Sequence, residues 1–287
     1  MPHPVGGRAR YGLLALALTT FGCPAQAQGN GCDVLSSGQT DVPSLSSAVT
    51  PENLLELRDI GSLRSYPDAR ALAISPDARQ IAFQMRRADP ASNSYCLAMV
   101  VLDLRDGATP RIVDRGGALI RISSDFQDMA DFPSGVSRVI TPRWSSDGRW
   151  IAFLKRSQGL TQVWRSNADG SGSRQISHSA VDVRDFRIDP HGKAIIYESR
   201  PDQRAVEEAL DREALSGYHY DDRFSPISRS RPRPRPVPSS YVTVDVESGE
   251  ERQATEQERR ALAGSPTDTP PARSTVARSK SGQTAWT

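Results

Sequence analysis

The chain is 287 residues long, with 37% hydrophobic residues, 24% charged residues and a formal net charge of +2. A charge so near zero gives no support for nucleic acid or an anionic membrane surface as a partner. The 21 prolines and 21 glycines favour a protein rich in turns and β-strands over a helical one.

The first 27 residues have the pattern of a secretory signal peptide. Arg8 and Arg10 supply the basic start, the stretch 12–22 is apolar, and the small-x-small sequence at 25–27 suits a signal peptidase. Cleavage there predicts export to the periplasm, with a flexible leader at 28–49. Lipid attachment at Cys23 is the alternative. No later segment has enough consecutive apolar residues for a membrane span.

Two cysteines, Cys32 and Cys96, would remain after cleavage. An even pair in an oxidising compartment is typical of a disulfide. We therefore expect a bond that ties the start of the mature chain to the first repeat described below. Two independent buried or free thiols are the alternative.

A short helix is expected from Thr50, which can cap it, through Pro51, which suits a first helical turn. Leu54, Leu57 and Ile60 follow at helical spacing, so we expect this stripe to dock on the core.

A repeated phrase then dominates the chain, at 75–83, 145–153 and 189–197. Each copy is a polar turn, a basic residue and an apolar run that ends in an aromatic residue. Such self-similarity indicates a repeat architecture, and the second spacing is close to one blade of a β-propeller. The flanking β-prone segments and Asp-Gly turns complete four antiparallel strands around each copy.

These patterns predict an all-β fold, namely a partial β-propeller of about three four-stranded blades plus the start of a fourth, with short helical insertions. The blades are expected at about 70–113, 143–177 and 185–254, within an incomplete propeller that covers 50–287. Residues 114–140 are expected to be a long connection, and a weak echo of the phrase at 281–286 would begin the fourth blade. Because propellers close at four to eight blades, we expect the chain to be part of a longer protein.

The third blade carries an insertion at 199–240. A helix is predicted over about 202–215, followed by the polar and aromatic cluster 218–224. The alternating Arg-Pro run at 231–236 must be extended, because proline fixes φ and disfavours helix before it. A stiff, solvated loop is the expected role of this run, and a ligand for proline-recognising domains is the alternative.

The repeat phrase with its Asp-Gly turns resembles the propellers of prolyl oligopeptidase-like serine peptidases and of the periplasmic TolB-type proteins. The lead-in at 54–61 and the segment 217–226 within the insertion make the chain similar to the lasso peptide isopeptidases, a branch of the first group. That resemblance implies an exported enzyme whose propeller gates and binds a peptide substrate. It also implies a C-terminal α/β-hydrolase domain with a Ser-Asp-His triad. No cofactor is expected.

The sequence contains no Gly-x-Ser-x-Gly nucleophile elbow, so we expect no catalytic residue and no metal site in this chain. The resemblance implies that the cluster in the insertion contacts peptide through Tyr218, His219, Tyr220 and Arg223. A salt-bridged corner that anchors the insertion is the plainer interpretation of the same residues. A stand-alone TolB-like propeller that binds proteins is the alternative function.

Overall fold

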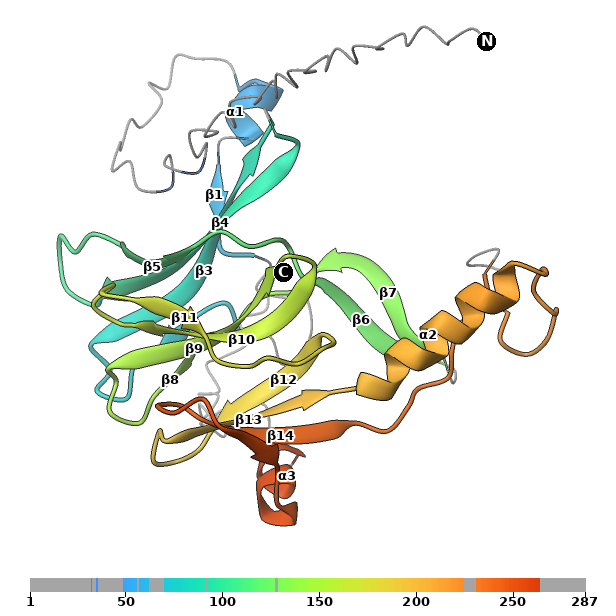
Figure 1. Ribbon diagram of the computed structural model, residues 1–287. Coiled ribbons are helices and arrows are strands. Elements are labelled where there is room, and N and C mark those ends of the chain that lie inside the picture. Colours follow the sequence, from blue (N-terminus) through green and yellow to red (C-terminus); the bar gives the residue numbers. More distant parts are fainter. Residues whose placement is uncertain are drawn as a thin grey trace, which may run out of the picture. The chain divides into compact units, whose positions relative to one another are not determined.

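The computed structural model describes Cys32, Leu35 and residues 49–55, 57–61, 70–90, 92–126, 129–224 and 231–263 (Figure 1). The predicted signal peptide at 1–27, most of the leader at 28–49 and the echo at 281–286 lie outside these residues. No described helix is long and apolar enough to cross a membrane.

Three antiparallel sheets follow one another along the chain, and each takes its strands in nearly sequential order. The first contains β1 (Arg58–Asp59), β2 (Ala73–Ile74), β3 (Gln80–Asp89), β4 (Ser94–Asp103) and β5 (Arg111–Arg115). The second contains β8 (Arg143–Trp144), β9 (Trp150–Ser157), β10 (Leu160–Asn167) and β11 (Ser173–Gln175). The third contains β12 (Val183–Ile188), β13 (Ala194–Ser199), β14 (Ser240–Asp245) and β15 (Glu251–Gln253). These three blades confirm the predicted partial β-propeller.

The blades share one hydrophobic core, because alternate residues of a strand point to opposite faces of its sheet. Met99 and Val101 of the first blade, Ile151 and Val163 of the second, and Tyr197 of the third belong to the same buried cluster. The other face of the first blade builds a separate cluster.

The predicted turns of the repeat phrase are held by side chains that bond to the backbone. In the second blade the Ser145 hydroxyl donates to Asp147 at 2.6 Å and accepts from the Trp150 amide at 3.2 Å. Gly148 in the same turn has φ of 69°, which a residue without Cβ adopts at little cost. The tight turn brings the two strands of the phrase into register.

Two expectations for the connections hold only in part. Residues 114–140 connect the first two blades, but they contain a two-stranded hairpin that we did not predict, β6 (Arg121–Phe126) and β7 (Met129–Ser137). Of the stripe beside α1 (Pro51–Leu55), Ile60 packs against the cluster of the first blade, whereas Leu54 and Leu57 are 56% and 62% exposed. A helix of five residues is too short to present a continuous apolar face.

The insertion of the third blade begins with α2 (Pro201–Ala214), close to the predicted helix, and Leu210 is its buried apolar contact. The Arg-Pro run is extended as expected, but Pro232 and Pro234 are buried and not solvated. A final helix, α3 (Glu256–Ala263), follows the third blade.

Candidate functional site

Two large cavities open on the described part of the chain. The first, which we call the turn-side cavity, has a volume of about 920 Å³ and lies among the strand-connecting turns of the three blades. Asp147, His191 and Asp245 are among its lining residues. Its carboxylates are mostly occupied by the turns themselves, as for Asp245, which accepts the amides of Glu247 and Ser248.

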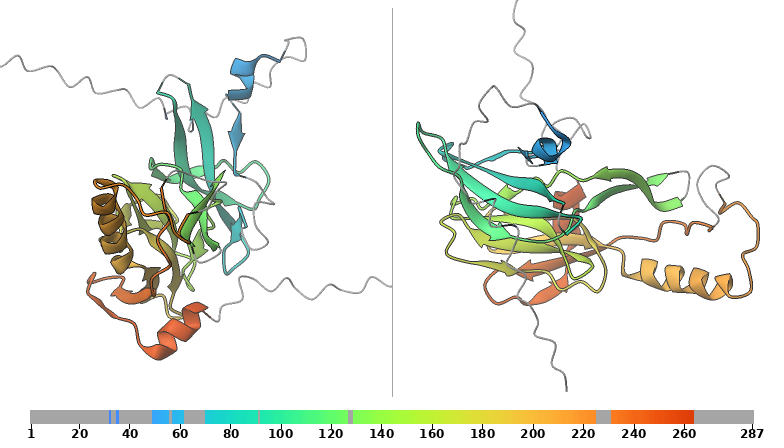
Figure 2. Two further views of the ribbon diagram at one scale, coloured as in Figure 1. Left: turned by 90° about the vertical axis from the view of Figure 1, so that its right-hand side faces the viewer. Right: turned by 90° about the horizontal axis from the view of Figure 1, so that it is seen from above.

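The second cavity, the insertion cavity, has a volume of about 990 Å³. Its lining includes the start of the β6–β7 hairpin at 119–124, residues of the segment 138–143, strand β12 with the residues before it, and the first turns of α2. Single residues of β7, β9, β10 and β13 complete it: Asp131, Arg156, Thr161 and Glu198. Figure 2 shows the hairpin and α2 leaving the blades on the same side. The insertions of the first and third blades therefore contribute to this cavity together with residues of the blades themselves.

Direct contacts join the two insertions. Arg200, at the start of α2, donates two hydrogen bonds to both oxygens of Asp125 on β6, at 2.9 and 2.7 Å. The hydrogen bonds from Arg200 lower the pKa of Asp125. Further along, the Ala130 amide donates to the Pro234 carbonyl at 2.8 Å. Because both contacts link segments far apart in sequence, the hairpin and the insertion form one structural unit.

Ion pairs occupy most charged groups in the cavity wall. Arg143 donates to Asp185 at 3.0 Å, and Arg156 donates to both oxygens of Asp182 at 2.9 and 2.8 Å. Such charge-assisted pairs fix side-chain directions. They also leave these arginines with little remaining attraction for another anion.

Arg138 differs from its neighbours in the wall. Its Nη1 donates to the Arg184 carbonyl at 2.7 Å, and no carboxylate of the described residues forms an ion pair with it. Burial lowers the pKa of Arg138, and repulsion from Arg143 and Arg184 adds to the effect while Asp185 opposes it. Arg138 is thus a half-buried cation whose hydrogen-bond partner is a neutral carbonyl.

Gln203, in the first turn of α2, is the second unusual residue in this wall. The residue is 9% exposed, and neither its side-chain amide oxygen nor its side-chain amide nitrogen has a partner among the described residues. Burying a polar group without a hydrogen bond costs free energy. This side chain therefore has an unused donor and acceptor beside the cavity.

The four predicted contact residues lie past the end of α2 and line neither cavity. Arg223 donates to both oxygens of Glu213, at 2.9 Å each, and also to Asp221. This arrangement lowers the pKa of Asp221 to about 2, chiefly through the hydrogen bond from Arg223. A substrate carboxylate would have to compete with Glu213 and Asp221 for that guanidinium group.

The aromatic members of the same cluster pack on one another. The rings of Tyr220 and Phe224 stack with centroids 5.1 Å apart, and Tyr218 meets Phe224 edge-on at 6.2 Å. Tyr220 is nevertheless 75% exposed, and the His219 amide donates to Glu213 at 3.2 Å. The cluster is thus a salt-bridged corner that presents one exposed aromatic side chain.

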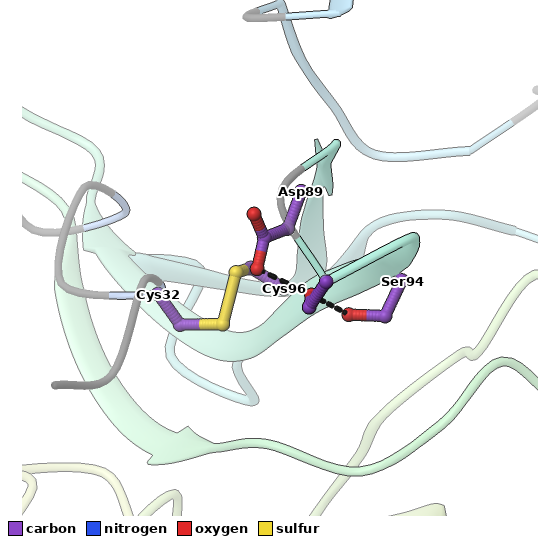
Figure 3. The surroundings of a disulfide bond; sticks show 5 residues. Cys32, Asp89, Ser94 and Cys96 are labelled. Atoms are coloured by element: carbon purple, nitrogen blue, oxygen red, sulfur yellow. Dashed lines mark hydrogen bonds between the residues drawn. A yellow bond between two sulfur atoms is a disulfide. The ribbon is translucent and has the colours of Figure 1, made fainter. Parts of the chain in front are cut away.

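Cys32 and Cys96 form a disulfide, drawn with its surroundings in Figure 3. Cys96 lies on β4 and is 1% exposed. Leu35 packs in the same cluster on the outer face of the first blade. The bond therefore attaches the segment around Cys32 to the first blade.

The described residues contain no group of three or more His, Cys, Asp or Glu side chains placed to hold a metal ion. Of two histidines that the sequence offers, His191 lies in a turn, where its amide donates to Asp189 at 3.1 Å, and His178 lies in the irregular segment after β11, where its amide donates to Glu251 at 3.0 Å. Both histidine side chains are exposed.

Sequence reasoning missed Arg138 and Gln203 because nothing in their local sequence marks a site. Arg138 follows a hairpin that carries no strong turn signal, and Gln203 lies in an ordinary amphipathic helix. The available signal was the unusual length of two insertions, in the first and third blades. Long loops in a compact domain often have a function.

We compared the chain with known proteins. No family model matches the chain. The lasso peptide isopeptidase AtxE2 of Asticcacaulis excentricus is 35% identical over 264 residues, which are 91% of this chain and 36% of the relative. Dipeptidyl-peptidase 5 of Porphyromonas endodontalis is 24% identical over 70% of this chain and 24% of its own length. The chain therefore spans about a third or less of these two relatives.

A solved structure of the AtxE2 isopeptidase, a serine-to-alanine variant with Astexin3-dC4 bound, superposes with a TM-score of 0.71. It is 34% identical, and the match covers 79% of this chain and 34% of that one. The apo form of the same enzyme gives a TM-score of 0.68. The chain belongs to the prolyl oligopeptidase-like serine peptidases, as a β-propeller part related to the lasso peptide isopeptidases.

Proposed function

We propose that this chain is the non-catalytic propeller section of an exported lasso peptide isopeptidase, and that it gates and binds the peptide substrate. The observation that carries the proposal is the 35% identity to AtxE2 over 91% of the chain, joined to the fold match with that enzyme in a peptide-bound form. Bond cleavage would belong to an α/β-hydrolase domain elsewhere in the protein.

The insertion cavity is the part of this chain that we assign to the peptide. Its volume, about 990 Å³, lies at the upper end of the usual range for ligand pockets. Two insertions tied by Arg200 and Asp125 give it walls from separate blades. A rigid, partly polar cavity of this kind suits a compact, folded peptide better than a long extended chain.

For the 218–224 cluster we propose a supporting role at the outer end of the insertion. Arg223 would hold the corner through Glu213 and Asp221, while Tyr218, His219 and Tyr220 would offer surface to the substrate. Replacing Tyr220 or Arg223 in the full-length enzyme should then lower peptide turnover while the fold survives. Unchanged kinetics in both variants would remove the cluster from the substrate path.

Export to the periplasm is also part of the proposal. The predicted signal peptide supports it, as does the disulfide between Cys32 and Cys96, because such bonds persist in oxidising compartments. Fractionation of cells that express the protein, with the mature N-terminus sequenced, tests this point. A cytoplasmic protein that retains residues 1–27 would contradict it.

The binding role is tested by titrating the purified chain with Astexin3-dC4 and with an unthreaded linear peptide of the same sequence. We expect saturable binding of the threaded form and weaker binding of the linear one. The reading frame downstream of Thr287 gives an independent test, since it should encode further blades and a nucleophile elbow. A stop codon after a few more blades would favour the stand-alone binding module.

A further inference from the structure

We propose that the insertion cavity is a carboxylate-binding site, with Arg138 as its cation and Gln203 as its second polar contact. The carboxylate would belong to the peptide that the cavity holds, so this assignment rests on the proposed function. It names a chemical feature of the substrate, and it gives a role to two residues that the fold alone leaves unexplained.

The first step is the charge balance of the cavity wall. Asp182 and Asp185 are bonded to Arg156 and Arg143, and Asp131 is bonded to Arg184. Arg138 lies among these pairs with a carbonyl as its hydrogen-bond partner. A cation in a partly desolvated wall that lacks its own counter-ion attracts an anionic ligand strongly.

The second step is the geometry of the donor groups. A guanidinium group presents parallel N–H donors that match the two oxygens of a carboxylate. Only Nη1 of Arg138 is engaged by the Arg184 carbonyl, which leaves the other N–H groups for a ligand.

The third step is Gln203, an independent observation. Gln203 lines the same cavity, and neither polar atom of its buried amide is bonded among the described residues. An amide N–H can donate to a carboxylate oxygen. The positive end of the α2 dipole lies at the same turn and favours negative charge there. A bound carboxylate would satisfy the donor whose burial is otherwise unfavourable.

Other charged groups in the wall do not offer the same site. Arg200 is bonded to Asp125, and Arg204 is paired with Glu208 in the next turn of the helix. Glu207 is bonded to Arg231, and Glu198 accepts from Ser239 at 2.5 Å. These groups have hydrogen-bond partners of their own, and Arg121, another arginine of the wall, is exposed to solvent. Arg138 is therefore the partly buried arginine of the wall that lacks a carboxylate partner among the described residues.

A small probe tests the site without any peptide. Thermal unfolding of the full chain is measured in glutarate, with chloride at matched ionic strength as the reference. We expect glutarate at several times its Kd to raise the Tm of the wild type by about 2–4 °C. The Arg138→Gln variant should lose this shift, and Arg105→Gln, which removes an exposed charge elsewhere, should keep it. A Tm that glutarate leaves unchanged in the wild type, or raises equally in Arg138→Gln, overturns the proposal.

A second variant guards against misfolding of Arg138→Gln. Gln203→Met removes the unpartnered amide but keeps the shape, so it should raise the Tm of the ligand-free protein. The same change should weaken glutarate binding several-fold. A residue with a purely structural role would not combine higher stability with weaker binding, and unaltered glutarate binding would remove Gln203 from the site.

Peptide titrations identify the source of the carboxylate. Astexin3-dC4 is compared with a form amidated at its C-terminus and a form whose side-chain carboxylates are replaced by amides. We expect one of the two modified forms to bind the wild type about tenfold more weakly, and Arg138→Gln to abolish that difference. If both modified forms bind as tightly as the parent, no peptide carboxylate is recognised and the proposal fails.

The two arms separate this inference from the proposed function. If the wild type binds none of the peptides but shows the Arg138-dependent glutarate shift, the carboxylate site stands and the peptide-binding role falls. If peptide binds, but Arg138→Gln changes neither the glutarate shift in Tm nor the affinity difference between parent and amidated peptides, the peptide-binding role stands and the carboxylate site falls.

Discussion

At the scale of single residues, the repeat phrase is a hydrogen-bonding device that tolerates substitution. In the second blade the Ser145 hydroxyl and the Asp147 carboxylate share the task of accepting turn amides. In the third blade Asp189 stands at the serine position and accepts the amides of Lys193 and Ala194 through one oxygen, at 2.6 and 2.7 Å. One carboxylate thus replaces two side chains, which explains why His191 can occupy the usual aspartate position.

The same turn in the first blade contains backbone strain that can be tested. Ala78 has φ of 57° where the second blade has Gly148 at 69°. A side chain in this region costs about 1–2 kcal/mol, whereas glycine adds unfolded-state entropy worth about 0.4–1 kcal/mol. Ala78→Gly should therefore stabilise the protein by about 0.5–1 kcal/mol in urea unfolding, and Gly148→Ala should destabilise it by a similar amount. If both changes shift stability in the same direction, backbone strain is not the cause.

The aspartate of the turn gives a prediction about pH. The hydrogen bond from Ser145, followed by that from the Arg149 amide, lowers the pKa of Asp147 from 3.8 to about 2. Because the folded pKa lies below the unfolded one, the carboxylate stabilises the fold above about pH 4. That contribution is lost as the pH falls toward 2.

A carboxyl carbon NMR titration checks both the value and its cause. The midpoint of Asp147 should lie near 2 in the wild type, and Ser145→Ala should move it upward toward the ordinary value. Asp169, whose turn contains no contact with Ser145, serves as the internal control and should not move. A wild-type midpoint of Asp147 near 3.8 would contradict the assignment.

At the scale of elements, the structure consists of regular blades with two irregular insertions. Asp125 on β6 and Arg200 before α2 hold these insertions together, with side chains 32% and 14% exposed. Asp125→Asn should therefore increase amide hydrogen exchange in β6, β7 and α2 by roughly tenfold to a hundredfold. Exchange in the central strands of the blades should not change.

The exposed pair Arg204–Glu208 on α2 provides the matched control. Its side chains are 66% and 54% exposed, and exposed pairs contribute little to stability. Arg204→Gln should thus leave the exchange of all three elements as in the wild type. Equal effects of both substitutions, or faster exchange throughout the blades, would show that the Asp125–Arg200 pair does not act locally.

Elements with strong local signals could be predicted from sequence, and the others could not. Helix α2 follows from Pro201 at its start and its apolar spacing, and the blade strands follow from turn chemistry and alternation. The β6–β7 hairpin lacked both signals, since the sequence between its strands has no glycine, and Pro133 and Gly135 are atypical of a strand such as β7. The hairpin also contacts the distant insertion, as in the hydrogen bond from Ala130 to Pro234, which no local pattern encodes.

At the scale of the whole molecule, the same limit applies to the candidate site. The three blades could be predicted because each repeats one phrase, and their order follows the chain. The insertion cavity could not be predicted, because Arg138 and Gln203 come from different insertions. What makes them unusual is the set of groups that surround them in the folded protein. Whether Arg138 has a counter-ion depends on its neighbours in space, and the residues beside it in sequence do not indicate them.

The interface between the first two blades carries the last prediction. Lys155 on β9 donates to Asp114 on β5 and to the Arg115 carbonyl, each at 2.7 Å. Its ammonium group lies 4.2 Å from the centre of the Trp164 ring. Ser173 on β11 donates to the other oxygen of Asp114 at 2.7 Å. With side chains 11% and 7% exposed, Lys155 and Asp114 form a nearly buried ion pair between blades.

Removing one member of such a pair leaves a buried charge, which costs about 3–5 kcal/mol, whereas replacing both by apolar groups is often close to neutral. Lys155→Met should therefore lower the free energy of unfolding by that amount, and Lys155→Met with Asp114→Leu should recover most of the loss. Because the blades share one core, urea unfolding should remain a single transition in every variant. A double variant as unstable as the sum of the single ones would mean that the two charges act independently, and a second transition would mean that the blades unfold separately.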